Sequence, residues 1–221
     1  MAVRLQEVHP AIVHYPLALL PVAVGADLLG RATGSEALAS VGRTLMPVAA
    51  ASAIVSAVTG LVAQEEVQAD GEAADLLVTH RSLNLGLVTL STALAVHRVR
   101  QKESPGAGYF ALALAGLGAM AYSAYLGGKM VYEHGLGVKP ADGLRDDPPP
   151  ELSASNARQI ARRVGQDVER GIAHTIEDYR HGDVLPALGH RHDTPAARSA
   201  VGGLGATTGD GDAAGAPETI P

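Results

Sequence analysis

Four of the five histidines beside the long apolar segments of the chain could meet at one site, and each carries a side chain that can bind a metal ion or a haem iron. They are His9, His14, His80 and His134. A neutral imidazole ligates zinc, copper or iron through a ring nitrogen, and two imidazoles that face each other across a helix bundle can hold a haem. Because an imidazole inside a bilayer is costly, it usually faces the bundle interior and has a partner there. These residues are therefore candidate ligands if the fold brings them together.

The segments beside these histidines are long enough to cross a membrane. Apolar runs cover residues 11–29, 45–63, 76–96 and 108–128, and a membrane helix needs about 20 such residues. The second and fourth runs contain no charged residue, whereas a soluble helix carries charge on its outer face. We therefore expect an all-α fold, a four-helix transmembrane bundle in the lipid bilayer. Small residues recur every four positions in these two runs, for example Ala49 and Ala53, which predicts close helix packing.

The direction of the four spans predicts that the histidines converge. His9 and His14 open the first span, His80 opens the third, and His134 follows the fourth, which runs in the opposite direction. All four should therefore lie at the same membrane face. His14 and His80 each lie about one turn inside a span, so they are the strongest candidates for a shared interior site.

Other residues accompany this predicted site. Asn84 lies one turn beyond His80 on the same helix face, and Tyr132 precedes His134 in a glycine-rich stretch that can fold back over the bundle mouth. Asp27 stands four residues before Arg31, a spacing that predicts an ion pair along one helix. Tyrosines near span ends can form an aromatic belt in place of the missing tryptophan: they are Tyr15, Tyr109, Tyr122, Tyr125 and Tyr132.

The chain changes character after residue 140. We expect three regions: a transmembrane domain over residues 1–140, a linker and soluble amphipathic helix over 141–181, and a disordered tail over 182–221 that is rich in Gly, Ala, Pro and Asp. Apolar residues recur every four positions in that helix, at Ile160, Val164, Val168, Ile172 and Ile176. This stripe could lie on the membrane, self-associate or rest on the bundle, or the helix could simply be solvated.

Composition and charge narrow the function further. The chain has no cysteine, which excludes disulfides, cysteine-bound zinc, iron–sulfur clusters and covalent c-type haem. No basic patch with interleaved aromatics is present, so we expect no nucleic-acid partner. The first span reads as a retained helix, not a cleaved signal peptide. A weak excess of Lys and Arg in the first and third inter-span loops predicts a multi-pass protein of the inner (plasma) membrane with both termini outside.

Three stretches carry a family resemblance: HPAIVHYPLAL at the start, HRSLNLG in the third span, and YLGGKMVYEHGLGV after the fourth. Over residues 6–139 the chain resembles a bacterial membrane family known as domain of unknown function 2231. The resemblance implies a four-helix membrane fold but no settled activity. Some relatives are joined to c-type cytochrome modules, which implies redox surroundings and a periplasmic cytochrome or other redox partner. Tyr15 stands where an aromatic residue, often Phe, is usual in that family.

Three functional hypotheses follow. The first is a haem b protein in membrane electron transfer, with His14 and His80 as axial ligands and His9 or His134 as alternates. The second is a non-haem site in which three or four of these histidines bind or transport a Zn, Cu or Fe ion. The third is a membrane anchor or interaction protein without a cofactor, and a homo-oligomer is compatible with each. The sequence contains neither the GxSxG nucleophile-elbow motif of α/β-hydrolases nor the HExxH motif of zinc proteases, so no motif indicates a particular enzyme activity.

Overall fold

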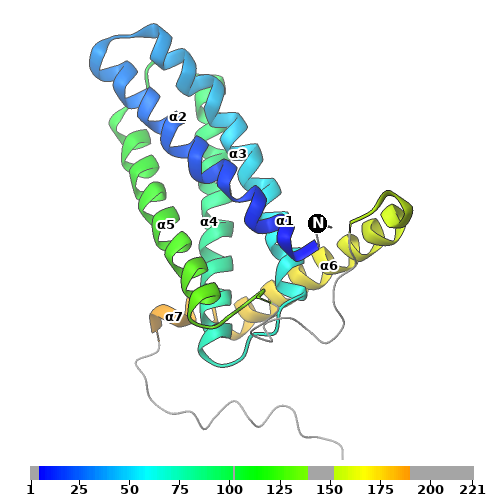
Figure 1. Ribbon diagram of the computed structural model, residues 1–221. Coiled ribbons are helices and arrows are strands. Elements are labelled where there is room, and N and C mark those ends of the chain that lie inside the picture. Colours follow the sequence, from blue (N-terminus) through cyan, green and yellow to red (C-terminus); the bar gives the residue numbers. More distant parts are fainter. Residues whose placement is uncertain (1–4, 102, 139–151, 190–221) are drawn as a thin grey trace, which may run out of the picture. The chain divides into compact units, whose positions relative to one another are not determined.

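Helices make up the regular structure of the chain. The computed structural model describes residues 5–101, 103–138 and 152–189, and no strand occurs among them. In chain order the elements are α1 (Leu5–Ile12), α2 (His14–Thr33), α3 (Glu36–Glu65), α4 (Glu72–Arg100), α5 (Ala107–Tyr132), a short 3₁₀ turn η2 (Ala154–Asn156), α6 (Ala157–His181) and α7 (Pro186–Gly189) (Figure 1). The predicted all-α class is confirmed.

Four long helices form an antiparallel bundle. The α2 helix packs on α3, α3 on α4, and α4 on α5, while α5 also contacts α2. Among the described residues, three helices are long and apolar enough to cross a membrane: Glu7–Thr33, which joins α1 and α2, then α3 and α5. The α4 helix, which corresponds to the predicted third span, is not among them.

The polar residues of α4 explain its lower hydropathy. Several of them are buried between the other helices, where they meet protein instead of lipid: Thr79, Arg81, Ser82, Ser91 and Arg98. Two of them have partners on other helices: the Thr79 hydroxyl accepts from the Ala187 amide, and Arg98 donates to Asp27. The α4 helix therefore meets its neighbours partly through polar side chains.

The first span is broken near its entrance. The α1 helix ends at Ile12 and α2 begins at His14. Pro16, in the first turn of α2, has no N–H to donate to the carbonyl of Ile12, so the regular hydrogen-bond ladder is interrupted there. The α1 helix then packs on α3. Val13 between the two helices keeps helical backbone angles, and the Leu17 amide donates to the Val13 carbonyl at 3.3 Å, so the helix faces continue across the interruption.

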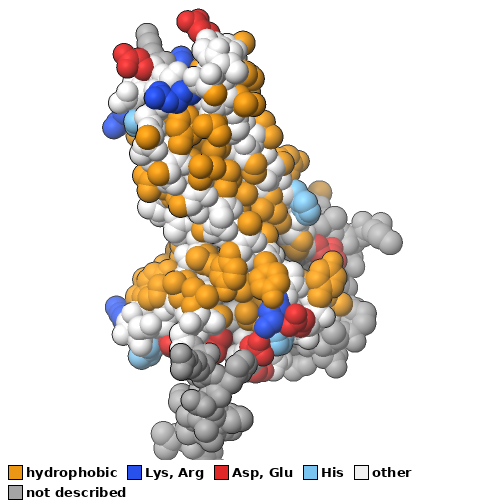
Figure 2. All heavy atoms as spheres, turned by 90° about the vertical axis from the view of Figure 1, so that its left-hand side faces the viewer, with side chains coloured by type: hydrophobic (Ala, Val, Ile, Leu, Met, Phe, Trp, Pro, Cys, Tyr) orange, Lys and Arg blue, Asp and Glu red, His pale blue; other side chains and the backbone are white. Residues whose placement is uncertain are grey.

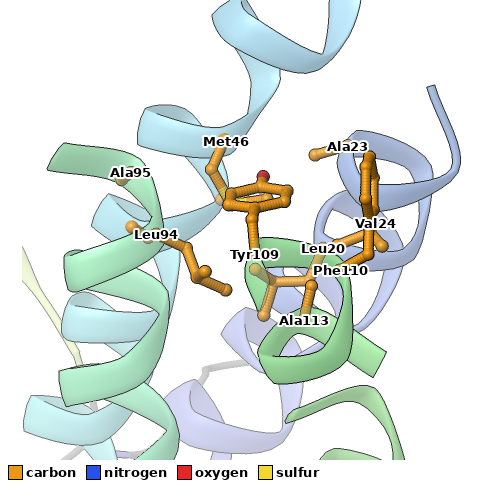
Figure 3. Packing of buried hydrophobic residues seen from close by; sticks show 11 residues of the cluster. Leu20, Ala23, Val24, Met46, Leu94, Ala95, Tyr109, Phe110 and Ala113 are labelled. Atoms are coloured by element: carbon orange, nitrogen blue, oxygen red, sulfur yellow. The ribbon is translucent and has the colours of Figure 1, made fainter. Parts of the chain in front are cut away.

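Small residues and a few large ones fill the core at the far end of the bundle from this entrance. In Figure 3 the Tyr109 ring occupies the centre, with Leu94 on one side and Leu20 and Phe110 on the other. Tyr109 packs edge-on against Phe110, with ring centroids 5.3 Å apart. Ala49 and Ala53 are buried, as the small-residue spacing predicts.

The outer surface of the bundle is apolar. Figure 2 shows hydrophobic side chains along the shaft, with charged side chains gathered toward the two ends. Large aliphatic residues of the spans remain exposed, for example Val22, Val48, Val55 and Leu112. An apolar surface of this extent is unfavourable in water and favourable in lipid.

The last helices lie at the end of the bundle where the chain enters. The α6 helix packs on α3 and α7 packs on α4. Residues 186–189, within the segment for which the sequence predicts disorder, form α7. The remainder of the predicted tail, from residue 190, and most of the predicted linker, residues 139–151, lie outside the described residues.

Candidate functional site

His9 is fixed between α1 and α3. Its Nδ1 lies 3.0 Å from the carbonyl oxygen of Ser56 and 3.4 Å from the hydroxyl of Thr59. A carbonyl only accepts, so Nδ1 carries the proton and, in a neutral ring, Nε2 keeps its lone pair. A Cβ added at Gly60 would lie 3.1 Å from the His9 ring. The glycine therefore leaves the space that the imidazole occupies.

His80 is held in the same manner between α4 and α5. Its Nδ1 lies 2.9 Å from the carbonyl oxygen of Ser123 and 3.0 Å from the Ser123 hydroxyl. Asn84 donates to that hydroxyl at 2.8 Å and to the carbonyl of His80 at 2.7 Å. Gly127 lies beside the ring, where an added Cβ would stand 3.4 Å from it. The predicted association of Asn84 with His80 is thus present in the structure.

The two rings belong to one end of the bundle. Both rings donate from Nδ1 to a backbone carbonyl of a neighbouring helix. Within the described residues neither Nε2 has a hydrogen-bond partner. Two histidines therefore present an unprotonated ring nitrogen, the form that binds a metal.

His14 does not join this pair. It is exposed at the start of α2, whereas the sequence predicts that it lies inside the bundle. Five residues separate it from His9, which places the two side chains about 140° apart on a helix. Because His9 faces α3, His14 must face outward, so the structure does not place His14 beside His80 inside the bundle.

His134 and Tyr132 also depart from the predicted cluster. His134 is half-buried and its Nε2 is buried without a partner among the described residues. The chain turns back after α5 through Gly135 and Gly137, both at positive φ, and buries Leu136. Tyr132 is 90% exposed and points away from the bundle. In the part of the chain that the structure describes, no group of three or more His, Cys, Asp or Glu side chains could hold a metal ion.

A buried ion pair occupies the opposite end of the bundle, and sequence analysis missed it. Arg98 donates from Nε and Nη2 to both carboxylate oxygens of Asp27, at 2.9 and 2.8 Å, and the Tyr109 hydroxyl donates to Asp27 Oδ2 at 2.8 Å. Asp27 is 1% exposed and Arg98 0%. Arg98 Nη2 also donates to the carbonyl of Ala39 at 3.0 Å. The network thus joins α2, α3, α4 and α5.

This network corrects two predictions. Asp27 pairs with Arg98 on another helix, and Arg31, its predicted partner, is exposed. Tyr109 is buried on Asp27 and does not belong to an aromatic belt. A buried carboxylate needs several donors, and Arg98 with Tyr109 supplies three. The signal was available, because residues 27, 98 and 109 all lie at the same end of their spans.

A glycine makes room for the ion pair. A Cβ added at Gly42 would lie 2.1 Å from Asp27 Oδ1, so α3 can approach the carboxylate only with glycine at this position. The carboxylate and guanidinium are both saturated by protein groups. The ion pair at this end of the bundle therefore has a structural role, and we call it the structural clamp. The unprotonated ring nitrogens of His9 and His80 lie at the other end.

Comparison with known proteins agrees with the membrane architecture. Residues 6–140, more than half of the chain, match a family described as a predicted membrane protein, domain of unknown function 2231. No curated protein and no solved structure matches the chain. With its apolar spans, its helical bundle and this match, the chain belongs to the domain of unknown function 2231 family of predicted membrane proteins.

Proposed function

We propose that His9 and His80 form a two-imidazole ligand site and that the protein is a membrane haem b protein that takes part in electron transfer. The observation that carries this proposal is that both histidines make the same kind of hydrogen bond. His9 Nδ1 donates to the Ser56 carbonyl at 3.0 Å, and His80 Nδ1 donates to the Ser123 carbonyl at 2.9 Å, each on an adjacent helix. Such bonds fix the tautomer and raise the basicity of Nε2 toward a metal. Both rings are thereby prepared for ligation.

The number of ligands favours haem over a bare ion. A haem iron takes four nitrogens from the porphyrin and needs only two from the protein, which matches the two prepared imidazoles. A structural or catalytic zinc takes three or four protein ligands. The described residues assemble no such set, so the non-haem Zn, Cu or Fe site is the second candidate.

The neighbouring residues would have supporting roles. Ser56, Ser123 and Asn84 orient the two rings, while Gly60 and Gly127 leave space at the ring edges. The bound group would supply one-electron chemistry, and the protein would hold it near one face of the membrane. A soluble redox protein such as a periplasmic cytochrome would exchange electrons there, if that face is the outer one.

Absorption spectroscopy and elemental analysis of one sample test the proposal. The full chain is purified in detergent from haem-replete cells. We expect a Soret band and iron near one atom per chain, and we expect both to fall in His80→Ala. A wild-type protein without a Soret band would overturn the haem proposal. Zinc or copper in its place would support the non-haem site, and a metal-free sample would support an anchor role.

A further inference from the structure

The α6 helix attaches to the bundle through its polar and small residues. Arg163 donates to both carboxylate oxygens of Glu66, at 2.8 and 2.9 Å, and His174 lies 2.9 Å from Glu65. Gly171 lies so close to α3 that an added Cβ would stand 3.1 Å from Leu61. The face of α6 that carries these residues is therefore the one that contacts the protein.

The apolar flank of α6 is left uncovered. Ile172 is 47% exposed and Ile176 46%, and Ile172 lies about 100° around the helix from Gly171. More large apolar residues are exposed at the end of α6, in the next turn and in α7: Tyr179, Val184, Leu185 and Leu188. We call these six residues the apolar flank. Of the predicted stripe, Ile160, Val164 and Val168 are half-buried, whereas contact with the bundle leaves its last two members, Ile172 and Ile176, uncovered.

The position of the apolar flank along the bundle identifies what can cover it. The α6 helix contacts the last turn of α3, a membrane-spanning helix, which ends at Glu65. The α7 helix is fixed near the start of α4, where the Ala187 amide donates to the Thr79 hydroxyl at 2.9 Å. Both helices thus lie at the depth where the spans leave the hydrocarbon. In Figure 2, which shows the side of α5 and α7, hydrophobic side chains continue from the shaft down to this level.

Polar residues at the same level are typical of the lipid headgroup region. Tyr15, Tyr125 and Tyr132 are exposed at this end of the spans, and tyrosines gather at the membrane–water boundary. Arg158 and Arg162 are exposed near the start of α6, and guanidinium groups pair well with lipid phosphates. This composition fits a helix that lies in the membrane interface.

We propose that α6 and α7 form an interfacial membrane element, which lies along the bilayer surface with the apolar flank in the acyl-chain boundary and its arginines among the headgroups. The polar contacts to Glu65 and Glu66 hold this element at the correct depth. The proposal does not depend on a cofactor, because it rests on contacts of α6 and α7 that include neither His9 nor His80. It assigns the bilayer, and not a second copy of the chain, to the apolar flank.

Site-directed fluorescence tests this assignment, and the absence of cysteine from the chain makes single-cysteine labelling direct. Full-length Ile172→Cys and Leu188→Cys are labelled with a bimane and reconstituted in vesicles of phosphatidylcholine and phosphatidylglycerol. Gln166→Cys is the matched control, since Gln166 is exposed and lies about 120° from Ile172 around the same helix.

We expect labels at positions 172 and 188 to emit at shorter wavelength and to be quenched by doxyl-labelled lipid more strongly than by aqueous iodide. The label at position 166 should show the reverse. Equal iodide quenching at all three positions would overturn the proposal. A disulfide-linked dimer of unlabelled Ile172→Cys on oxidation, together with no quenching of the labelled protein by doxyl lipid, would overturn it in favour of self-association. Two labelled positions on separate helices guard against a local effect of one substitution.

Discussion

At the residue scale, the stability of the bundle depends on groups that are buried with their partners. Asp27 receives three donors from Arg98 and Tyr109 and is only 1% exposed. Such a carboxylate is tolerated only while its donors are present, because an unpaired charge inside a membrane bundle is strongly unfavourable. Gly42, which faces this carboxylate, is equally constrained, because no side chain fits between α3 and Asp27.

Removal of the carboxylate should destabilise the protein. Asp27→Ala leaves the Arg98 guanidinium buried without its partner, and we expect a loss of about 3–5 kcal/mol in the free energy of unfolding. Unfolding in detergent, followed by circular dichroism, measures it. The control is Arg31→Ala, which alters an exposed residue and should change stability by no more than about 0.5 kcal/mol. Equal effects of the two substitutions would show that the ion pair is not a clamp.

Gly42 should not accept a side chain. Gly42→Ala places a Cβ 2.1 Å from Asp27 Oδ1, so either α3 or the carboxylate must move, and we expect a cost of about 1–3 kcal/mol. Gly118→Ala is the control, since an added Cβ there meets nothing within 4 Å, and alanine favours a helix by roughly 0.5–1 kcal/mol. The two variants should therefore shift the unfolding midpoint in opposite directions. A neutral Gly42→Ala would contradict the close approach of α3.

At the scale of elements, α6 is connected to α3 by a small number of polar contacts. Glu66 is 1% exposed, and its side chain accepts two hydrogen bonds from Arg163. Since Arg163 is itself partly exposed, the pair is intermediate between a surface and a buried ion pair, and its loss should cost roughly 1–4 kcal/mol. That cost falls on the attachment of α6 rather than on the bundle.

Limited proteolysis reports this attachment. In Arg163→Ala the buried carboxylate of Glu66 loses its donor, and we expect α6 to be cleaved faster while the bundle remains resistant. Arg162→Ala is the neighbouring control, because Arg162 is exposed. Identical cleavage rates in both variants and in the wild type would show that the ion pair does not retain α6.

At the scale of the whole molecule, hydropathy and direction of spans predict the architecture but not the phase of each helix. The apolar runs predict the four helices of the bundle, and the span directions bring His9 and His80 to the same end. The prediction placed His14 inside the bundle, but the structure exposes His14 and turns His9 toward α3. The two side chains lie about 140° apart on a helix, and the apolar run alone does not show which of them faces the neighbouring helix.

The spacing of residues along one helix also did not predict the partners of the buried charges. Spacing along one helix suggests Arg31 for Asp27, but a buried carboxylate is satisfied by donors from other helices, here Arg98 and Tyr109. The apolar stripe of α6 was visible in the sequence. The role of Gly171 could not be predicted from the sequence. Its close approach to α3, which turns the polar and small face of α6 toward the bundle, is visible only in the packed structure.

The central claim is that His9, and not His14, completes the ligand pair with His80. The most direct test is the absorption spectrum of purified His9→Ala beside that of His14→Ala, with circular dichroism to verify that both remain helical. We predict that His9→Ala loses the Soret band of the wild type and that His14→Ala retains it. A spectrum unchanged in His9→Ala, or lost in His14→Ala alone, would contradict this assignment.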